Sequence, residues 1–167
     1  ARAERFGLLA SQAGADIFVV QATVTTAEFK TSKGKVLSFH EFCKKMPIPV
    51  LVGNCVTYEA AFSLFQSGVS GILVGVGPGA ACTTRRVIGV GIPQITAICN
   101  VAKAQRDFYK KTKRYVPVVA DGGMRVGGDI AKAIACGADA VMLGSLLACA
   151  EEAPGRGYNW GMATSHA

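Results

Sequence analysis

Residues 71–86 read GILVGVGPGAACTTRR, a short apolar run followed by a glycine-rich turn. The run, Gly71–Gly75, has the length and the branched apolar residues of a buried strand. Three of the five residues 75–79 are glycines, which allow a sharp turn and expose backbone N–H groups to an anion. Cys82 then stands where the turn is expected to open into a helix, a position that favours an ionised thiol. We therefore predict a strand-to-helix turn that carries chemistry.

Further β-rich runs lie on either side of this stretch and alternate with helical segments. Such alternation predicts a parallel sheet with right-handed crossovers, and runs that are apolar at nearly every residue are expected to be buried on both faces. The expected strands are Asp16–Gln21, Pro49–Gly53, Gly71–Gly75, Val116–Ala120 and Ala140–Gly144. The expected helices cover residues 2–13, 38–45, 57–67, 94–112, 128–136 and 146–152.

Small or polar residues follow several of these strands: Gly53-Asn54, residues 75–84, residues 121–123 and Gly144-Ser145. The carboxyl ends of parallel strands share one edge, and in a (β/α)8 barrel this edge forms the active site. Because the strand–helix units make only part of a barrel, the predicted fold class is α/β, the C-terminal portion of a (β/α)8 TIM barrel, as one partial domain over residues 1–167. The alternative is an open doubly wound sheet, whose glycine fingerprint would follow the first strand and not the third.

Composition limits the classes of partner. Half of the 167 residues are hydrophobic and no apolar run reaches transmembrane length, so we expect one globular unit and no membrane partner. No secretion signal is visible, and a cytoplasmic protein is expected. The formal charge of +7 comes from scattered basic residues, apart from residues 110–114, the expected solvated end of a helix. A phosphorylated small molecule suits this charge at least as well as a nucleic acid, and no nucleic-acid partner is expected.

The cysteines and histidines suggest no metal cluster. Six cysteines stand without any C-x-x-C spacing, which predicts neither a zinc site nor a disulfide ladder, and most of them are expected to be small buried residues. His40 lies in an expected helix and His166 near the end of the chain. Because neither follows a strand, neither is expected to be a catalyst.

Two polar residues after strands have a functional and a structural interpretation each. Asp121 ends an apolar strand, where its carboxylate can hold a ribose diol, or it caps the helix near Gly128. Ser145 opens the helix near Leu146 and can bind a phosphate together with Gly123, or it is only the N-cap of that helix.

Cys82 also has two interpretations. It is either small filler under the loop or a reactive thiol. Its neighbours favour the second interpretation, because Thr83 and Thr84 supply hydroxyl groups and Arg85 and Arg86 supply positive charge that would favour a thiolate and attract phosphate. The tail, residues 154–162, mixes glycine with aromatics and reads either as a mobile flap over a nucleotide or as a loop packed on the rim.

Taken together, three motifs resemble the IMP dehydrogenase and GMP reductase superfamily. They are residues 75–85, residues 121–123, and residues 137–148 with 152–155. The resemblance spans nearly the whole chain and corresponds to about the fourth to eighth strands of the family's catalytic barrel. Residues 151–162 look most like a bacterial and cyanobacterial branch described as IMP-dehydrogenase-like.

The resemblance implies an oxidoreductase of guanine nucleotide biosynthesis. Cys82 would be the nucleophile that adds to C2 of IMP so that a hydride passes to NAD, and Thr84 would help to manage the water that hydrolyses the adduct to XMP. Asp121 matches the ribose-binding aspartate. The remaining substrate-binding residues implied are Gly123, Gly144 and Ser145 as the phosphate cradle, with Gly79 and Ala80 beside them.

The resemblance also implies a cofactor site, a cation and an assembly. Asn54, Gly75 and Gly77 would contact the cofactor, and the carbonyl groups of Gly77, Gly79 and Cys82 would ligate a monovalent cation such as K+. The family further suggests a homotetramer.

Three positions depart from the family pattern. Ala80 stands where a phosphate-binding serine is usual, Gln21 where dehydrogenases commonly carry an aspartate for the cofactor, and Leu73 where an arginine lies near the same pocket. The tail is altered as well. Two alternatives therefore stay open: a GMP reductase that uses NADPH and the same cysteine, and a non-catalytic protein that senses purine nucleotides.

Overall fold

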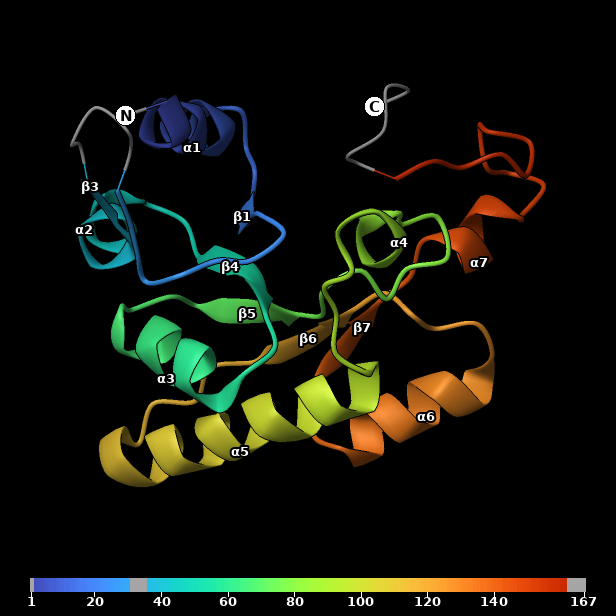
Figure 1. The fold of residues 1–167 in the computed structure, drawn as a ribbon. Helices are drawn as coiled ribbons and strands as arrows, with labels where there is room; N and C mark the ends of the chain where they lie inside the picture. The colour runs from blue at the N-terminus through green and yellow to red at the C-terminus, as the bar shows by residue number, and fades with distance from the viewer. Residues whose placement is uncertain (1, 31–35, 162–167) are drawn as a thin grey trace.

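The computed structural model describes residues 2–30 and 36–161. Its centre is a five-stranded parallel sheet in the order β1-β4-β5-β6-β7 (Figure 1). The strands are β1 (Phe18–Gln21), β4 (Val50–Cys55), β5 (Gly71–Val74), β6 (Val118–Asp121) and β7 (Ala140–Met142). The five strands expected from the sequence are thus confirmed, each with an end shifted by one or two residues.

Six of the described helices overlap the ranges expected from the sequence, and the one that begins at Thr84 was expected only as a helix that opens after the Cys82 turn. The helices are α1 (Arg2–Gln12), α2 (Phe39–Lys45), α3 (Tyr58–Gln66), α4 (Thr84–Ile88), α5 (Gln94–Thr112), α6 (Gly127–Ala135) and α7 (Ser145–Ala148). The last of these is shorter than the expected 146–152, because the chain passes after Cys149 into successive turns that lead to Pro154. Sequence reasoning missed the antiparallel pair β2 (Glu28–Lys30) and β3 (Val36–Ser38).

One face of the sheet forms the core against three helices. In Figure 1, α3, α5 and α6 lie together along one side of the strands. Alternate strand residues such as Val52, Ile72 and Val118 point to that side and are fully buried. Thr57 is the N-cap residue of helix α3, and its hydroxyl accepts a hydrogen bond from the Ala60 N–H. The helix contributes a buried stripe of Ala61, Leu64 and Phe65.

The opposite face is unevenly covered. Leu73 on the central strand is 1% exposed, whereas Val19 on β1 is 45% exposed and Met142 on β7 is 39% exposed. The expectation of strands buried on both faces is therefore confirmed for β5 and wrong for β1 and β7. These two strands have a neighbour on one side only within the described sheet.

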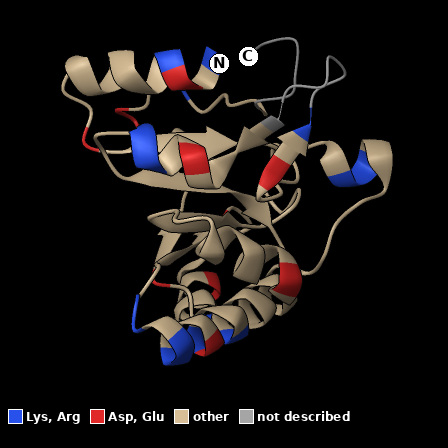
Figure 2. Ribbon diagram, turned by 90° about the vertical axis from the view of Figure 1, so that its left-hand side faces the viewer, with Lys and Arg blue, Asp and Glu red and all other residues tan. Residues whose placement is uncertain are grey.

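The charged end of α5 is not simply solvated. Basic and acidic segments lie side by side there in Figure 2, and Lys110 is paired with Asp107 at 3.8 Å. Arg114, however, donates hydrogen bonds to the carbonyl groups of Phe65 and Val69 and packs over the ring of Phe108. Among the described helices, none is long and apolar enough to cross a membrane.

Candidate functional site

A pocket of about 330 Å³ opens at the carboxyl edge of the sheet. Its walls come from the segments that follow β1, β4, β5 and β6, as expected for parallel strands whose carboxyl ends share one edge. The pocket lies between these turns and the end of the described chain. It is lined by Gln21, Ala22, Thr23, Asn54, Gly75, Gly77, Pro78, Gly79, Cys82, Thr83, Thr84, Asp121, Gly122 and Gly161.

A carboxylate held by two amides forms one wall of this pocket. Asp121 Oδ2 accepts a hydrogen bond from Gln21 Nε2 at 2.8 Å and another from Asn54 Nδ2 at 2.7 Å. Gln21 Nε2 also lies 3.1 Å from Asn54 Oδ1, which closes the triangle. Within the described residues, Asp121 Oδ1 accepts no hydrogen bond. The side chain is therefore fixed through Oδ2, and its Oδ1 retains acceptor capacity.

Strand register explains why these three side chains meet. Gln21 and Asp121 are the last residues of β1 and β6, and Asn54 lies near the end of β4, where Gln21 is in register with Gly53. Asp121 does not cap helix α6, whose N-cap residue is Val126 and has no side-chain cap. The cap interpretation of Asp121 is therefore wrong, and the ligand interpretation stays a prediction.

Cys82 is exposed and faces the pocket. Its backbone N–H donates to the Gly79 carbonyl, and its thiol donates to Thr84 Oγ1 at 3.3 Å. Helix α4 starts at Thr84, with Thr83 as its N-cap residue. The interpretation of Cys82 as buried filler is thus wrong, and the thiol and the Thr84 hydroxyl form a contacting pair in the same cavity.

Arg85 has a different role from the one expected. Its Nε donates to the Val76 carbonyl at 3.0 Å, and its terminal amino group donates to the Ile92 carbonyl. A Cβ at Gly77 would lie 2.9 Å from Arg85 Cγ, and Gly77 has a φ of 66°. The guanidinium therefore holds the two ends of the Cys82 loop and is committed to carbonyl oxygens.

The glycine-rich turn packs against the turn after β6. Gly122 and Gly123 both have positive φ, and a Cβ at Gly123 would lie 3.1 Å from Pro78 Cβ. Gly75 also has a positive φ, and a Cβ there would lie 2.7 Å from Gln94 Oε1 and 2.8 Å from the Asp121 carbonyl. The two turns therefore approach each other at a distance that only glycine permits.

Gln94 is a site residue that sequence reasoning missed. Its Nε2 donates to the carbonyl of Val74 at 2.7 Å and to that of Asp121 at 3.4 Å, so it links the ends of β5 and β6. Its Oε1 is buried and has no hydrogen-bond partner among the described residues. The lining residues Ala22 and Thr23 were also missed, whereas Gly161 belongs to the tail that was expected as a flap or a rim loop. Position after a strand was the only signal for the first two.

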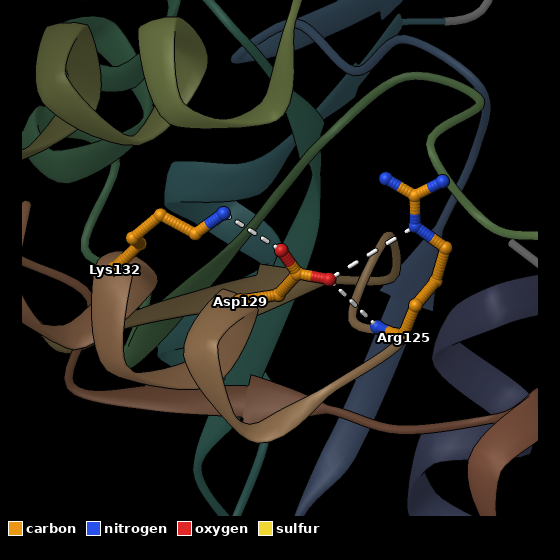
Figure 3. A network of polar contacts seen from close by, with 3 residues as sticks. All are labelled: Arg125, Asp129 and Lys132. Atoms are coloured by element: carbon orange, nitrogen blue, oxygen red, sulfur yellow. Dashed lines mark hydrogen bonds and ion pairs between the residues drawn. The ribbon is translucent and has the colours of Figure 1, made fainter.

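The turn after Asp121 is tied to helix α6 by an ionic network (Figure 3). Asp129 Oδ2 accepts from the Arg125 backbone N–H at 3.1 Å, and Asp129 Oδ1 lies 2.8 Å from Lys132 Nζ. The hydrogen bond from Lys132, followed by that from Arg125, lowers the pKa of Asp129 below its ordinary value. This network anchors the segment that carries Gly122 and Gly123.

Comparison with known proteins identifies the family of this chain. The family model described as the IMP dehydrogenase / GMP reductase domain matches residues 1–163. The chain belongs to this family. The expected superfamily is thus confirmed.

Individual relatives agree with the family assignment. An uncharacterized oxidoreductase of Mycolicibacterium smegmatis is 42% identical over 156 residues, which is 92% of this chain and 42% of the relative. Inosine-5'-monophosphate dehydrogenases of Thermoplasma acidophilum and Haemophilus influenzae are 48% and 46% identical over 145 residues. These matches cover 87% and 86% of this chain and 28% of each dehydrogenase.

A solved structure agrees with the fold. The crystal structure of an IMP dehydrogenase/GMP reductase-like protein from Corynebacterium glutamicum has a TM-score of 0.83 and 39% identity, over 93% of this chain and 40% of that protein. The prediction of an α/β fold that is part of a (β/α)8 barrel is confirmed.

The family's expected site residues fall into two groups in the structure. The pocket brings together Asn54, Gly75, Gly77, Gly79, Cys82, Thr84 and Asp121. The second group, expected around the nucleotide phosphate, lies outside the pocket lining and consists of Ala80, Gly123, Gly144 and Ser145.

Ser145 is not the N-cap of its helix. Gly144 occupies the N-cap position of α7 and makes no side-chain cap, and Ser145 is the first helical residue. Its Oγ instead accepts a hydrogen bond from Asn159 Nδ2 at 3.0 Å. The structural interpretation of Ser145 is thus wrong, and the tail approaches the residue expected at the phosphate.

The departures from the family pattern have distinct structural settings. Gln21 lies in the pocket wall and is bonded to Asp121. Leu73 is buried within the sheet and packs closely against Gly53. A Cβ added at Gly53 would lie only 2.5 Å from the Leu73 Cβ. His40 is exposed on α2, and His166 lies outside the described residues. The described residues contain no cluster of three metal-ligating side chains.

Proposed function

We propose that this chain carries the substrate-side half of an IMP dehydrogenase site, in which Cys82 adds to C2 of IMP, a hydride passes to NAD, and water releases XMP. The observation that carries the proposal is that a pocket-facing thiol, a hydroxyl bonded to it and an anchored carboxylate line one cavity: Cys82, Thr84 and Asp121. Two relatives with 46–48% identity are named inosine-5'-monophosphate dehydrogenases, which supports this choice of substrate.

Asp121 positions the nucleotide in this proposal. Its Oδ2 is held by Gln21 and Asn54, and its Oδ1 is available to accept a hydrogen bond from a ribose hydroxyl. A charged acceptor that is fixed before binding costs little conformational entropy when the ligand arrives. The phosphate would then extend toward the backbone N–H groups near Ala80, Gly123 and Ser145, where Asn159 already contacts Ser145.

Cys82 supplies the covalent step. Its sulfur forms a bond to C2 of the purine and makes that carbon tetrahedral, so that the C2 hydrogen can leave with its electron pair. A bound NAD supplies the hydride acceptor. Water then adds to the same carbon and the carbon–sulfur bond breaks, which returns the thiol and leaves XMP. Thr84 Oγ1, which accepts a hydrogen bond from the Cys82 thiol, lies where it can orient that water.

The pocket wall that carries Gln21 and Asn54 would hold the nicotinamide group. Gln21 and Asn54 present amide groups, and Ala22 and Thr23 provide small walls beside them. An amide has one donor side and one acceptor side, as does the carboxamide of nicotinamide, so the donor set is compatible. The Gly75 and Gly77 backbones complete this wall. Gln21 takes the place of an aspartate without introducing charge.

Two further features are part of the proposal. The carbonyl groups of Gly77, Gly79 and Cys82 belong to one turn and would ligate K+, with the Gly79 carbonyl already accepting the Cys82 N–H. Closure of the barrel would cover the apolar residues that β1 and β7 expose, and a homotetramer of such barrels is the proposed assembly.

The test is the formation of NADH from IMP and NAD by the full-length protein, followed by absorbance. We expect NADH formation that is lost in Cys82→Ala and retained in Cys149→Ser, since Cys149 is also exposed but lies outside the pocket. Folded protein that forms no NADH but oxidises NADPH in the presence of GMP would replace the proposal with GMP reduction. Tight IMP binding with neither reaction would indicate a nucleotide sensor.

A further inference from the structure

The cysteines are more exposed than the sequence analysis predicts. The expectation that most of them are buried is wrong, because only Cys55 is buried, Cys43 and Cys136 are half-buried, and the remaining three are exposed. Burial raises the pKa of Cys55 to about 12, which keeps this thiol protonated and unreactive. Cys82 lines the pocket, and the other thiols that are exposed or half-buried lie outside it.

Two of these thiols meet where α5 packs against α6. Cys99 lies near the start of α5, and Cys136 is the C-cap residue of α6, the helix beside it in Figure 1. The Cys136 side chain acts on the Cys99 thiol here and contributes to the raised pKa of Cys99. Both cysteines lie in the described part of the chain and neither is in a disulfide.

Backbone packing supports this contact independently. A Cβ at Gly137 would lie 2.6 Å from the Cβ of Ala102, so the two helices touch at this point. Cys136 directly precedes Gly137, and Cys99 lies one helical turn before Ala102 on the same face of α5. The two sulfurs are thus placed at a fixed, close crossing of the helices. A flexible loop does not carry either of them.

The surroundings of Cys99 act on its thiol in opposite directions. Burial raises the pKa of the Cys99 thiol, and the neighbouring Cys136 side chain raises it further. Arg106 lies on the same side of α5, with a guanidinium nitrogen 3.8 Å from the Cβ position of Gly137, and its charge acts to lower the pKa of Cys99. A basic side chain thus lies at the helix crossing that carries the two cysteines.

We propose that Cys99 and Cys136 form an oxidation site that a hydroperoxide converts into a disulfide joining α5 to α6. One sulfur of the pair, as its thiolate, attacks one oxygen of hydrogen peroxide, which forms a sulfenic acid and releases hydroxide. The thiol of the other cysteine then attacks this sulfur, a sulfur–sulfur bond forms, and the sulfenic oxygen leaves as water with the proton of that thiol. The two sulfurs are oxidised by two electrons in all, and the peroxide oxygens end as one water and one hydroxide.

The position of the bond gives it a consequence for the fold. Helix α5 begins at Gln94, which holds the carbonyl groups of Val74 and Asp121, and α6 follows the turn that Asp129 anchors. A disulfide between these helices would link the two supports of the carboxyl-edge turns. It would also restrict the unfolded chain, so the oxidised protein should unfold at a higher temperature than the reduced protein.

The test is peptide mapping of the full-length Cys149→Ser protein after treatment with hydrogen peroxide, digested with trypsin without reduction. Cys149 is replaced because it shares the tryptic peptide 133–156 with Cys136. We expect peptide 87–103 linked to peptide 133–156, with a mass two hydrogens below the sum of the two, and loss of this species after reduction. Unfolding should shift upward by several degrees on oxidation, with no such shift in Cys99→Ser.

Other results would overturn the proposal. Cys82, in peptide 46–85, serves as the internal control that the oxidant has acted. If Cys82 is oxidised while peptides 87–103 and 133–156 remain unlinked, or if Cys136 proceeds to sulfinic acid with Cys99 intact, the two sulfurs are not a disulfide-forming pair. Equal linkage of Cys82 to either peptide would show random oxidation.

Discussion

Two aspartates at opposite edges of the sheet differ in how many of their carboxylate oxygens accept hydrogen bonds from described residues. Asp121, at the carboxyl edge, has both of its amide donors on Oδ2 and no described partner on Oδ1. Asp139, at the amino edge, has both oxygens occupied: Oδ2 accepts from Gln105 Nε2 at 3.0 Å and from the Val118 N–H at 2.7 Å, and Oδ1 accepts from the Tyr115 hydroxyl.

The difference shows how one side-chain type serves two purposes in the same sheet. The Asp139 carboxylate accepts hydrogen bonds only from groups within the fold, and these bonds join α5, β6 and β7. The Asp121 carboxylate is fixed by internal donors but retains acceptor capacity toward a pocket. A carboxylate with unused acceptor capacity that is held rigidly at the carboxyl edge has the properties of a ligand site.

The largest effect should come from the thiol on the pocket side. Replacing Cys82 by Ser should reduce NADH formation by at least about 1,000-fold, because the hydroxyl is a far weaker nucleophile than the thiolate. Thermal unfolding should change little, since the side chain is exposed and has one weak hydrogen bond, to Thr84. A large loss of stability would show that Cys82 at the carboxyl edge stabilises the fold, as Asp139 does at the amino edge.

Asp121→Asn should have the next largest effect on activity. The amide has one acceptor atom instead of two, so it cannot serve Gln21, Asn54 and a ribose hydroxyl together. We expect kcat/KM for the nucleotide to fall about 10- to 100-fold, the range for loss of a hydrogen bond to a charged group. Unchanged kinetics with folded protein would remove Asp121 from the substrate site.

Asp139→Asn is the matched control at the other edge. It should leave kcat/KM unchanged and lower the free energy of unfolding by about 1–2 kcal/mol, because donors from Gln105 and Val118 lose a charged acceptor. Urea denaturation measures this change. Lost activity at full stability would contradict the division between the two edges.

The smallest effect concerns Tyr115 and appears only at high pH. The hydrogen bond to Asp139 raises the pKa of Tyr115 above 10, with burial and the charge of Asp139 adding to the shift. A raised pKa means that the pair stabilises the fold below pH 10 and loses this contribution as pH rises through the folded-state pKa. Urea midpoints should therefore fall more steeply above pH 10 in the natural protein than in Tyr115→Phe. Parallel curves would show that the pair contributes nothing.

Local patterns in the sequence predict the main sheet and its helices. Apolar runs that alternate with helical segments predicted all five strands of the main sheet, since a strand buried on both faces needs apolar residues throughout. The pair β2 and β3 was missed because its three-residue strands are too short to show an alternation. The glycine-rich turn and the position of Cys82 were also predictable, because backbone freedom is a property of the residues themselves.

Only the tertiary structure decided which groups meet. Gln21 is 33 residues from Asn54 and 100 residues from Asp121 along the chain, and parallel register brings all three to one wall. The same holds for Arg85, whose charge suggested a role with the thiol until its carbonyl partners were known. Likewise, the pairing of Cys99 with Cys136 depends on a helix crossing at Gly137. Residue types limit what a side chain can do, but hydrogen-bond partners depend on distances that strand register and helix packing set.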